Sequence, residues 1–163
     1  MLFGPLLAAY LLAASAFPFT PNRVVPAVRT PVELAELPGL LAAGHVQALG
    51  RRPSKARLAM AVALVRFENG NGREVFGFNL GNVGPSCGAA RSLMRDGGYY
   101  QAFASPIEGA AALWSRLAAW CPGALRYFDA GMAREAGAGL RRCGYHRMDA
   151  RYGEALRQLY GPG

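Results

Sequence analysis

Apolar side chains recur every three or four residues along several stretches of the chain, the spacing that buries one face of an α-helix. A short turn at Pro38-Gly39 is expected to precede a helix that runs through Leu49. The next helix begins after Ser54, whose hydroxyl can cap it, and ends at Glu68. Later helices are expected from Pro106 to just before Pro122, and over 123–129, 132–142 and 149–160.

The helix after Phe103 has the most specific start signal. Ser105-Pro106-Ile107-Glu108 combines a capping serine, a proline at the first helical position and an acid three residues after the serine. Trp114 falls on the apolar face of this helix and is predicted to lie in the core.

The interval between Gly70 and Gly98 is rich in glycine and has no helical period. Within it, Val75-Phe76-Gly77-Phe78 is predicted to be strand-like, and long irregular segments of this kind often carry function. The pattern as a whole predicts a mainly α fold of five or six helices, with a reduced loop or β-lobe beside a cleft.

The first residues form a separate region. Residues 2–19 carry no charge, and their apolar run is short for a membrane-spanning helix of about 20 residues. Three interpretations stay open: a leader or membrane-inserting segment, a helix packed on the protein itself, or a docking helix for a larger assembly through residues 1–22. Prolines at 18, 21, 26 and 31 predict an extended connector. We therefore expect a segment and connector over 1–31 and a single domain over 32–163.

Composition narrows the class of protein. Hydrophobic residues make up 52% and charged residues 17% of the chain, which indicates a folded domain and not a disordered one. The formal net charge of +8 favours polyanionic partners, such as nucleic acid, anionic lipid or the bacterial cell wall. Because the basic clusters over 51–57 and 141–147 contain no nucleic-acid-reading motif, no specific nucleic-acid partner is predicted.

The three cysteines, Cys87, Cys121 and Cys143, do not have the spacing of zinc ligands. With only His45 and His146 to add imidazole, no metal or other cofactor is predicted. One disulfide with a free thiol is an alternative in an oxidising compartment. The favoured expectation is three small buried thiols.

The stretch Phe67-Glu68-Asn69-Gly70-Asn71-Gly72 is the strongest candidate for chemistry. A helix that ends in glutamate can leave the carboxyl group partly buried in the wall of a cleft. Burial there favours the protonated form that a general acid needs. The glycines permit positive φ and a close approach of backbone to ligand. The alternative is a surface helix end without function.

Three blocks in this order resemble the glucosaminidase family of lysozyme-like bacterial wall hydrolases, which includes flagellar-rod peptidoglycan hydrolases and autolysins. The first block is Ala63 to Gly72, with its Glu-x-Gly-x-Gly, and the second is Phe78-Asn79-Leu80-Gly81-Asn82. The third starts at Tyr100-Gln101-Ala102-Phe103 with the serine cap, and continues to Cys143-Gly144-Tyr145 and Asp149-Ala150-Arg151-Tyr152.

The resemblance implies a lysozyme-like helical domain that cleaves the β-1,4 glycan strand of peptidoglycan as an N-acetylglucosaminidase or muramidase. It assigns Glu68 as the catalytic acid and Tyr145 as a second catalytic residue, and it implies no cofactor. Asn79, Asn82, Tyr100 and Tyr152 are expected to contact the substrate. Such a lysin acts in the periplasm, the cell envelope or outside the cell, or as part of a virion.

The family usually carries a second acidic residue in a longer segment before the aromatic pair. Here that interval is only Val83 to Tyr99, and Asp96 is its sole carboxylate, with Glu74 as a further candidate. The sugar's own N-acetyl group is an alternative nucleophile, and hydrolysis and lytic transglycosylation both stay open. The competing hypothesis is a non-catalytic structural component of a virion, secretion or flagellar-type assembly that keeps the same fold.

Overall fold

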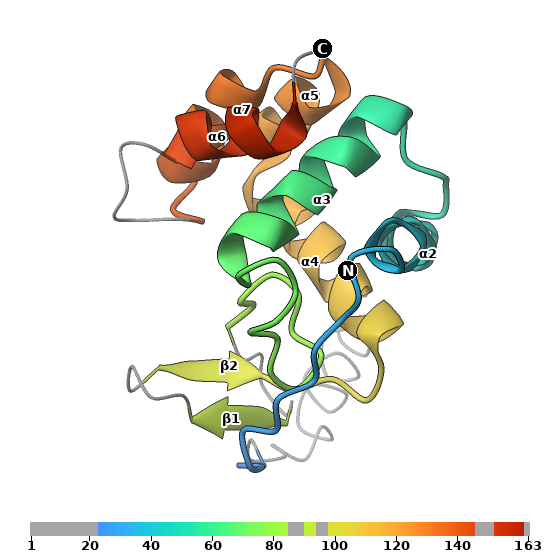
Figure 1. Ribbon diagram of the computed structural model, residues 1–163, viewed down its shortest axis with the longest axis vertical. Coiled ribbons are helices and arrows are strands. Elements are labelled where there is room, and N and C mark those ends of the chain that lie inside the picture. Colours follow the sequence, from blue (N-terminus) through green and yellow to red (C-terminus); the bar gives the residue numbers. More distant parts are fainter. Residues whose placement is uncertain (1–22, 85–89, 94–97, 146–151, 162–163) are drawn as a thin grey trace, which may run out of the picture.

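The computed structural model describes residues 23–84, 90–93, 98–145 and 152–161 (Figure 1). Over these residues the protein is mainly α, with six helices and one two-stranded sheet, as the sequence predicts. Several sequence predictions lie outside the described residues. They concern the segment 1–22, Cys87, Asp96, His146 and Asp149.

Helix α2 spans Leu37–Leu49 and helix α3 spans Lys55–Glu68. Proline occupies the first turn of α2, and Gly50 ends it in the left-handed region at φ 70°. The predicted cap of α3 is confirmed, because the Ser54 hydroxyl oxygen accepts a hydrogen bond from the Arg57 amide at 3.1 Å. Both helices end where the sequence predicts.

Helix α4 spans Pro106–Trp120, and the predicted start is confirmed by the Glu108 amide, which donates to the Ser105 hydroxyl at 3.2 Å. The chain continues through α5 (Pro122–Asp129), α6 (Ala133–Arg142) and α7 (Tyr152–Tyr160). Figure 1 shows α5, α6 and α7 at one end of the molecule, with α3 running from them towards the sheet.

Trp114 lies at the centre of the core, as predicted, and is fully buried. Its indole N–H donates to the carbonyl oxygen of Leu41 at 2.8 Å, which joins α4 to α2. The other large side chains buried to the same degree come from all six helices and the loop after α3: Leu37, Leu41, Met60, Leu64, Leu80, Leu113, Leu117, Phe128, Leu140, Tyr152 and Leu156.

The sheet consists of β1 (Arg91–Leu93) and β2 (Tyr99–Gln101), which pair antiparallel with Ser92 opposite Tyr100. The prediction of a strand over 75–78 is wrong. Phe76 forms only an isolated bridge with Arg29, and Gly77 and Phe78 both have φ of 53°, which turns the chain out of an extended path.

The proline-rich connector is hydrogen-bonded to the loop after α3 over its described part. The Thr30 amide donates to the Val75 carbonyl at 2.8 Å, the Gly77 amide donates to the Val28 carbonyl at 2.8 Å, and the Val32 amide donates to Gly72 at 3.1 Å. We name residues 23–32 the bracing segment. The folded unit therefore begins before the boundary expected at residue 31.

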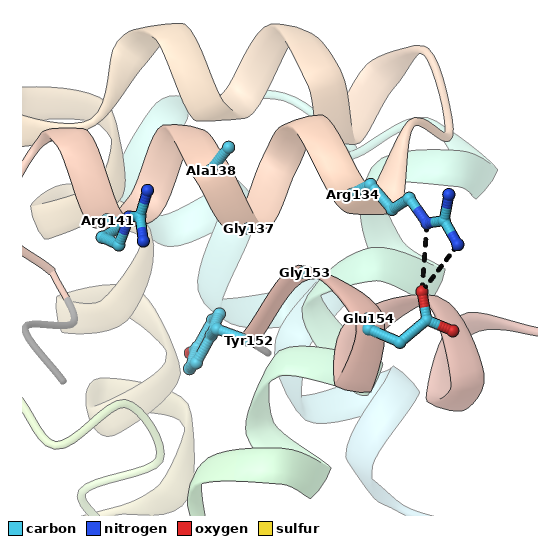
Figure 2. Close-up of a pocket in the computed structure, with 7 residues that line it drawn as sticks. All are labelled: Arg134, Gly137, Ala138, Arg141, Tyr152, Gly153 and Glu154. Carbon is cyan, nitrogen blue, oxygen red and sulfur yellow. Dashed lines mark hydrogen bonds and ion pairs between the residues drawn. The ribbon is translucent and has the colours of Figure 1, made fainter. Parts of the chain in front are cut away.

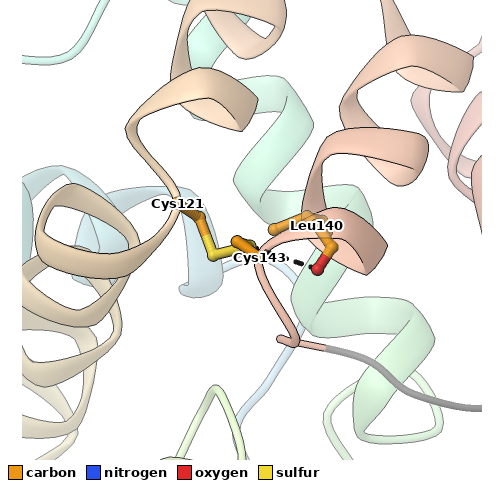
Figure 3. Close-up of a disulfide and its surroundings, with 3 residues drawn as sticks. All are labelled: Cys121, Leu140 and Cys143. Atoms are coloured by element: carbon orange, nitrogen blue, oxygen red, sulfur yellow. Dashed lines mark hydrogen bonds between the residues drawn. A yellow bond between two sulfur atoms is a disulfide. The ribbon is translucent and has the colours of Figure 1, made fainter.

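Cys121 and Cys143 form a disulfide, with their Cα atoms 5.4 Å apart, so the favoured expectation of three thiols is wrong (Figure 3). The bond connects the end of α4 to the end of α6, and the Leu140 carbonyl oxygen lies 3.1 Å from the Cys143 sulfur. Sequence spacing alone does not indicate the pair, because 22 residues separate the cysteines and the packing of α4 against α5, and of α5 against α6, brings them together.

A polar network connects α2, α3 and α5, in which His45 and Arg57 are buried and Asp129 is exposed. The Arg57 guanidinium, 6% exposed, donates to the Asp129 carboxylate from Nε at 2.8 Å and also forms an ion pair with it through Nη2. Arg57 Nη1 lies 3.2 Å from His45 Nε2, and His45 Nδ1 lies 2.6 Å from the Arg51 carbonyl oxygen. Because a carbonyl only accepts, the imidazole carries its proton on Nδ1 and accepts from Arg57 on Nε2.

Candidate functional site

Glu68 is the last residue of α3. Figure 1 shows that this end of α3 leads into the loop on the side of the molecule where the sheet lies. Asn69 closes the helix: its buried amide donates to the carbonyl oxygens of Val65 at 3.3 Å and Leu80 at 2.7 Å. The backbone then turns sharply, with φ of 51° at Gly70 and 84° at Gly72, which confirms the positive φ predicted for these glycines.

The Glu68 carboxyl group is half-buried, and each of its oxygens accepts a hydrogen bond. Oε1 accepts from the hydroxyl of Tyr152, the first residue of α7. Oε2 accepts from the side-chain amide of Asn82 at 3.0 Å. The fold thus brings together the carboxyl, an amide and a hydroxyl from three distant parts of the sequence.

Tyr152 is held by packing as well as by its hydrogen bond. It is 1% exposed, and its ring meets the Phe67 ring edge-on with 4.8 Å between centroids. Burial and the negative charge of Glu68 raise the pKa of Tyr152 well above its ordinary value. The hydroxyl therefore keeps its proton over the whole neutral range and acts as a fixed donor to Glu68.

Tyr145 lies near Glu68 but donates elsewhere. Its hydroxyl donates to the Gly81 carbonyl oxygen at 2.8 Å. Burial, followed by the charge of Glu68, raises the pKa of Tyr145, and so this phenol also stays protonated. Through this hydrogen bond Tyr145 holds the backbone next to Asn82, the residue that contacts Glu68. Its catalytic role stays a prediction.

Asn79 makes its side-chain hydrogen bonds with the backbone of the loop and of β2, and not with Glu68. The Asn79 side chain is 3% exposed; it donates to the Val83 and Gln101 carbonyls, both at 2.9 Å, and accepts from the Val83 amide at 2.8 Å. With its amide bound in this way, Asn79 closes the loop. Its contact with substrate stays a prediction. Tyr100 lies in β2, half-buried.

A pocket of about 290 Å³ lies between α6 and α7, on the side of Tyr152 that faces α6 (Figure 2). Arg134, Arg141 and Glu154 line it, and Glu154 is bound by Arg134 at 3.0 Å and by Arg157. These arginines lower the pKa of Glu154 to about 2, so it is a paired carboxylate at neutral pH. Glu154 is therefore a poor candidate for a general acid.

The sequence interpretation missed the contributions of two residues, Asn71 in the turn after Glu68 and Arg116 on α4. Asn71 shares the left-handed turn with its neighbouring glycines at φ 60°, and the alternation Asn-Gly-Asn-Gly is the signal for it, because asparagine tolerates this region best after glycine. Arg116 lies over the ring of Tyr145, 5.7 Å from its centroid. Sequence offers no signal for this second contact, because it depends on how α4 packs.

Within the described part of the chain, no group of three or more His, Cys, Asp or Glu side chains is placed to hold a metal ion. None of the described helices has the length and apolar character required to cross a bilayer.

Comparison with known proteins finds no relative of this chain. No protein-family model, curated protein sequence or solved structure gives a significant match to this chain.

Proposed function

We propose that this protein cleaves the β-1,4 glycan strand of bacterial peptidoglycan, with Glu68 as the general acid. One observation carries the proposal: the side chains of Glu68, Asn82 and Tyr152, one from each of the three blocks that resemble the glucosaminidase family, meet at a single carboxyl group. Hydrogen bonds on both oxygens fix the orientation of that carboxyl, as proton transfer to a bound substrate requires. A lysozyme-like domain is part of the same proposal.

In the proposed reaction, Glu68 gives its proton to the bridging oxygen of the scissile bond. The bond between that oxygen and the anomeric carbon breaks, and the sugar acquires oxocarbenium character. Asn82 and Tyr152 hold the carboxyl during the transfer. No second carboxyl group of the described residues hydrogen-bonds to this cluster, so the sugar's own acetamido oxygen is the proposed internal nucleophile, and water or a sugar hydroxyl completes the reaction.

Two further features support action on the wall outside the cytoplasm. The Cys121–Cys143 disulfide is of the kind that persists in oxidising compartments. The net charge of +8 favours the acidic wall as a partner. We therefore place the protein in the periplasm, at the cell envelope or outside the cell.

The test is release of soluble muropeptides from purified walls. We expect Glu68→Gln, which keeps the shape of the side chain and removes the acid, to lower the rate by at least about a hundredfold. Glu135→Gln, at an exposed position on α6, is the matched control and should act like the native protein. Full activity in Glu68→Gln, or loss of activity in Glu74→Gln alone, would contradict the assignment.

No hydrogen bond joins a second carboxyl group of the described residues to Glu68, and this favours one competing function, a structural component of a larger assembly. In that case native and Glu68→Gln proteins would both leave walls intact, and both would co-sediment with the assembled particle.

A further inference from the structure

The end of α4 carries an exposed aromatic side chain with an arginine over it. Trp120, the last residue of α4, is 67% exposed, more than any other large apolar side chain described. The Arg116 guanidinium lies one turn earlier, 5.2 Å from the centroid of the Trp120 ring. This contact holds the indole in one orientation without covering it.

Arg116 contacts two rings, because it is also 5.7 Å from the centroid of Tyr145. It is half-buried, yet no hydrogen bond or ion pair to another described residue involves its side chain. Guanidinium carries five N–H donors and pairs with carboxylates in a two-pronged geometry. The rings fix the plane of Arg116 and leave these donors for an anion.

The surface is continuous with the Glu68 cluster. A Cβ atom on Gly84 would lie 3.7 Å from Arg116 Nη1, and Asn82, two residues earlier, contacts Glu68 at 3.0 Å. Two residues of extended chain span at most about 7 Å. Tyr145 touches both regions, through its ring to Arg116 and through its hydroxyl to Gly81.

The disulfide fixes the geometry of this surface. Cys121 directly follows Trp120, and Cys143 lies two residues before Tyr145. The bond therefore joins the two chain segments that carry the rings contacted by Arg116. Figure 3 shows the bond itself. A surface built on tied segments loses little conformational entropy when it binds a ligand.

We infer that Trp120, Arg116 and Tyr145 form a substrate subsite beside Glu68, in which a sugar ring stacks on Trp120 while Arg116 binds a carboxylate of the attached peptide stem. The identity of the strand rests on the proposed function. Sugar rings present apolar C–H faces to an indole, and the peptide stems of the wall carry free carboxylates. Neutral chitooligosaccharides can stack on Trp120 but have no carboxylate for Arg116 to bind.

The experiment measures binding by calorimetry, on full-length protein carrying Glu68→Gln so that no turnover occurs. The probes are chitotetraose and a wall tetrasaccharide with its peptide stems. We expect Trp120→Ala to weaken binding of both probes about tenfold, and Arg116→Gln to weaken binding of the peptide-bearing probe alone, also about tenfold. Met132→Ala and Arg126→Gln, two exposed positions away from this surface, are the matched controls.

Unchanged binding in Trp120→Ala and Arg116→Gln, with circular dichroism as in the parent protein, would overturn the inference. Equal weakening of both probes by Arg116→Gln would overturn the carboxylate assignment. The readout is independent of catalysis. If native protein leaves walls uncut while Trp120→Ala still weakens binding, the proposed chemistry fails and the subsite stands.

Discussion

At the scale of single residues, Glu68 differs from the other acidic side chains described, because both of its oxygens are bound by uncharged side-chain donors. Glu154 and Asp129, by contrast, pair with arginines. Uncharged donors orient a carboxyl without neutralising it. Such an arrangement fixes the orientation of the carboxyl group, which the proposed proton transfer requires.

Replacing Tyr152 with phenylalanine tests this orienting role. The ring should still pack on Phe67, whereas Oε1 of Glu68 loses its donor, so we expect kcat for wall cleavage to fall about ten- to a hundredfold with KM little changed. Steady-state kinetics on soluble glycan strands is the measurement. Tyr160→Phe, on the same helix, is the control. An unchanged kcat in Tyr152→Phe would reduce Tyr152 to a packing residue.

The position of Glu68 at a helix end and the positive φ of Gly70 and Gly72 are predictable from sequence, because both depend on neighbouring residues. The roles of Tyr145 and Asn79 are not predictable in this way. A tyrosine that donates to a backbone carbonyl 64 positions away and one that faces a sugar have the same local sequence.

At the scale of elements, the bracing segment and the loop after α3 depend on Gly72. A Cβ atom at this position would lie 2.5 Å from the Val32 carbonyl oxygen, and φ is 84°. The bracing segment therefore approaches the loop at a point where no other side chain fits.

We expect Gly72→Ala to lower the free energy of unfolding by about 3 kcal/mol, since the added methyl group both strains the backbone and collides with Val32. Gly50→Ala is the control for backbone strain alone. Its φ is 70° and nothing lies within 4 Å of the added atom, so about 1 kcal/mol is expected. Urea unfolding followed by circular dichroism measures both. Equal losses of unfolding free energy in Gly72→Ala and Gly50→Ala would contradict the close approach of Gly72 to Val32.

The disulfide should stabilise the fold by restricting the unfolded chain. Closing a loop of 22 residues contributes about 3 kcal/mol in the chain-entropy model. We expect the double variant Cys121→Ser with Cys143→Ser to unfold at a lower urea concentration, by the amount that this free energy implies. A reductant should bring native protein to the same midpoint and leave the variant unchanged. If the urea midpoint of the native protein is the same with and without reductant, the disulfide is contradicted.

The helices are predictable because their caps and periods are local, as at Ser54 and Ser105. The sheet and the bracing segment are not, because their partners are distant. Arg91 pairs with Gln101 and also forms backbone hydrogen bonds with Arg23 and Val25. The spacing of apolar residues along the sequence does not indicate such pairings.

At the scale of the whole molecule, the network of His45, Arg57 and Asp129 makes stability depend on pH. Burial, assisted by the positive charge of Arg57, lowers the pKa of His45 below its ordinary 6.5. The unfolded chain therefore binds a proton at a pH where the folded protein does not. The free energy of unfolding is unaffected above about pH 6.5 and decreases as the pH falls below it.

Between pH 6.5 and 5.5 we expect a loss of up to about 1 kcal/mol, measured by urea unfolding at each pH. His45→Asn should be less stable overall but lose this slope, because asparagine at position 45 does not titrate in this range. His146→Asn, which removes the other histidine of the chain, should keep the slope. The same slope in His45→Asn would assign the effect to other groups.

The bracing segment also limits how far the protein can be shortened. Its amide and carbonyl groups at Val28, Thr30 and Val32 are bound to the loop that follows Glu68. A truncated version starting at Val32 would lose the hydrogen bonds that Val28 and Thr30 make with Gly77 and Val75. The loop that follows Glu68 would then lack these contacts. A recombinant fragment intended to keep the carboxyl in place should therefore begin no later than Arg23.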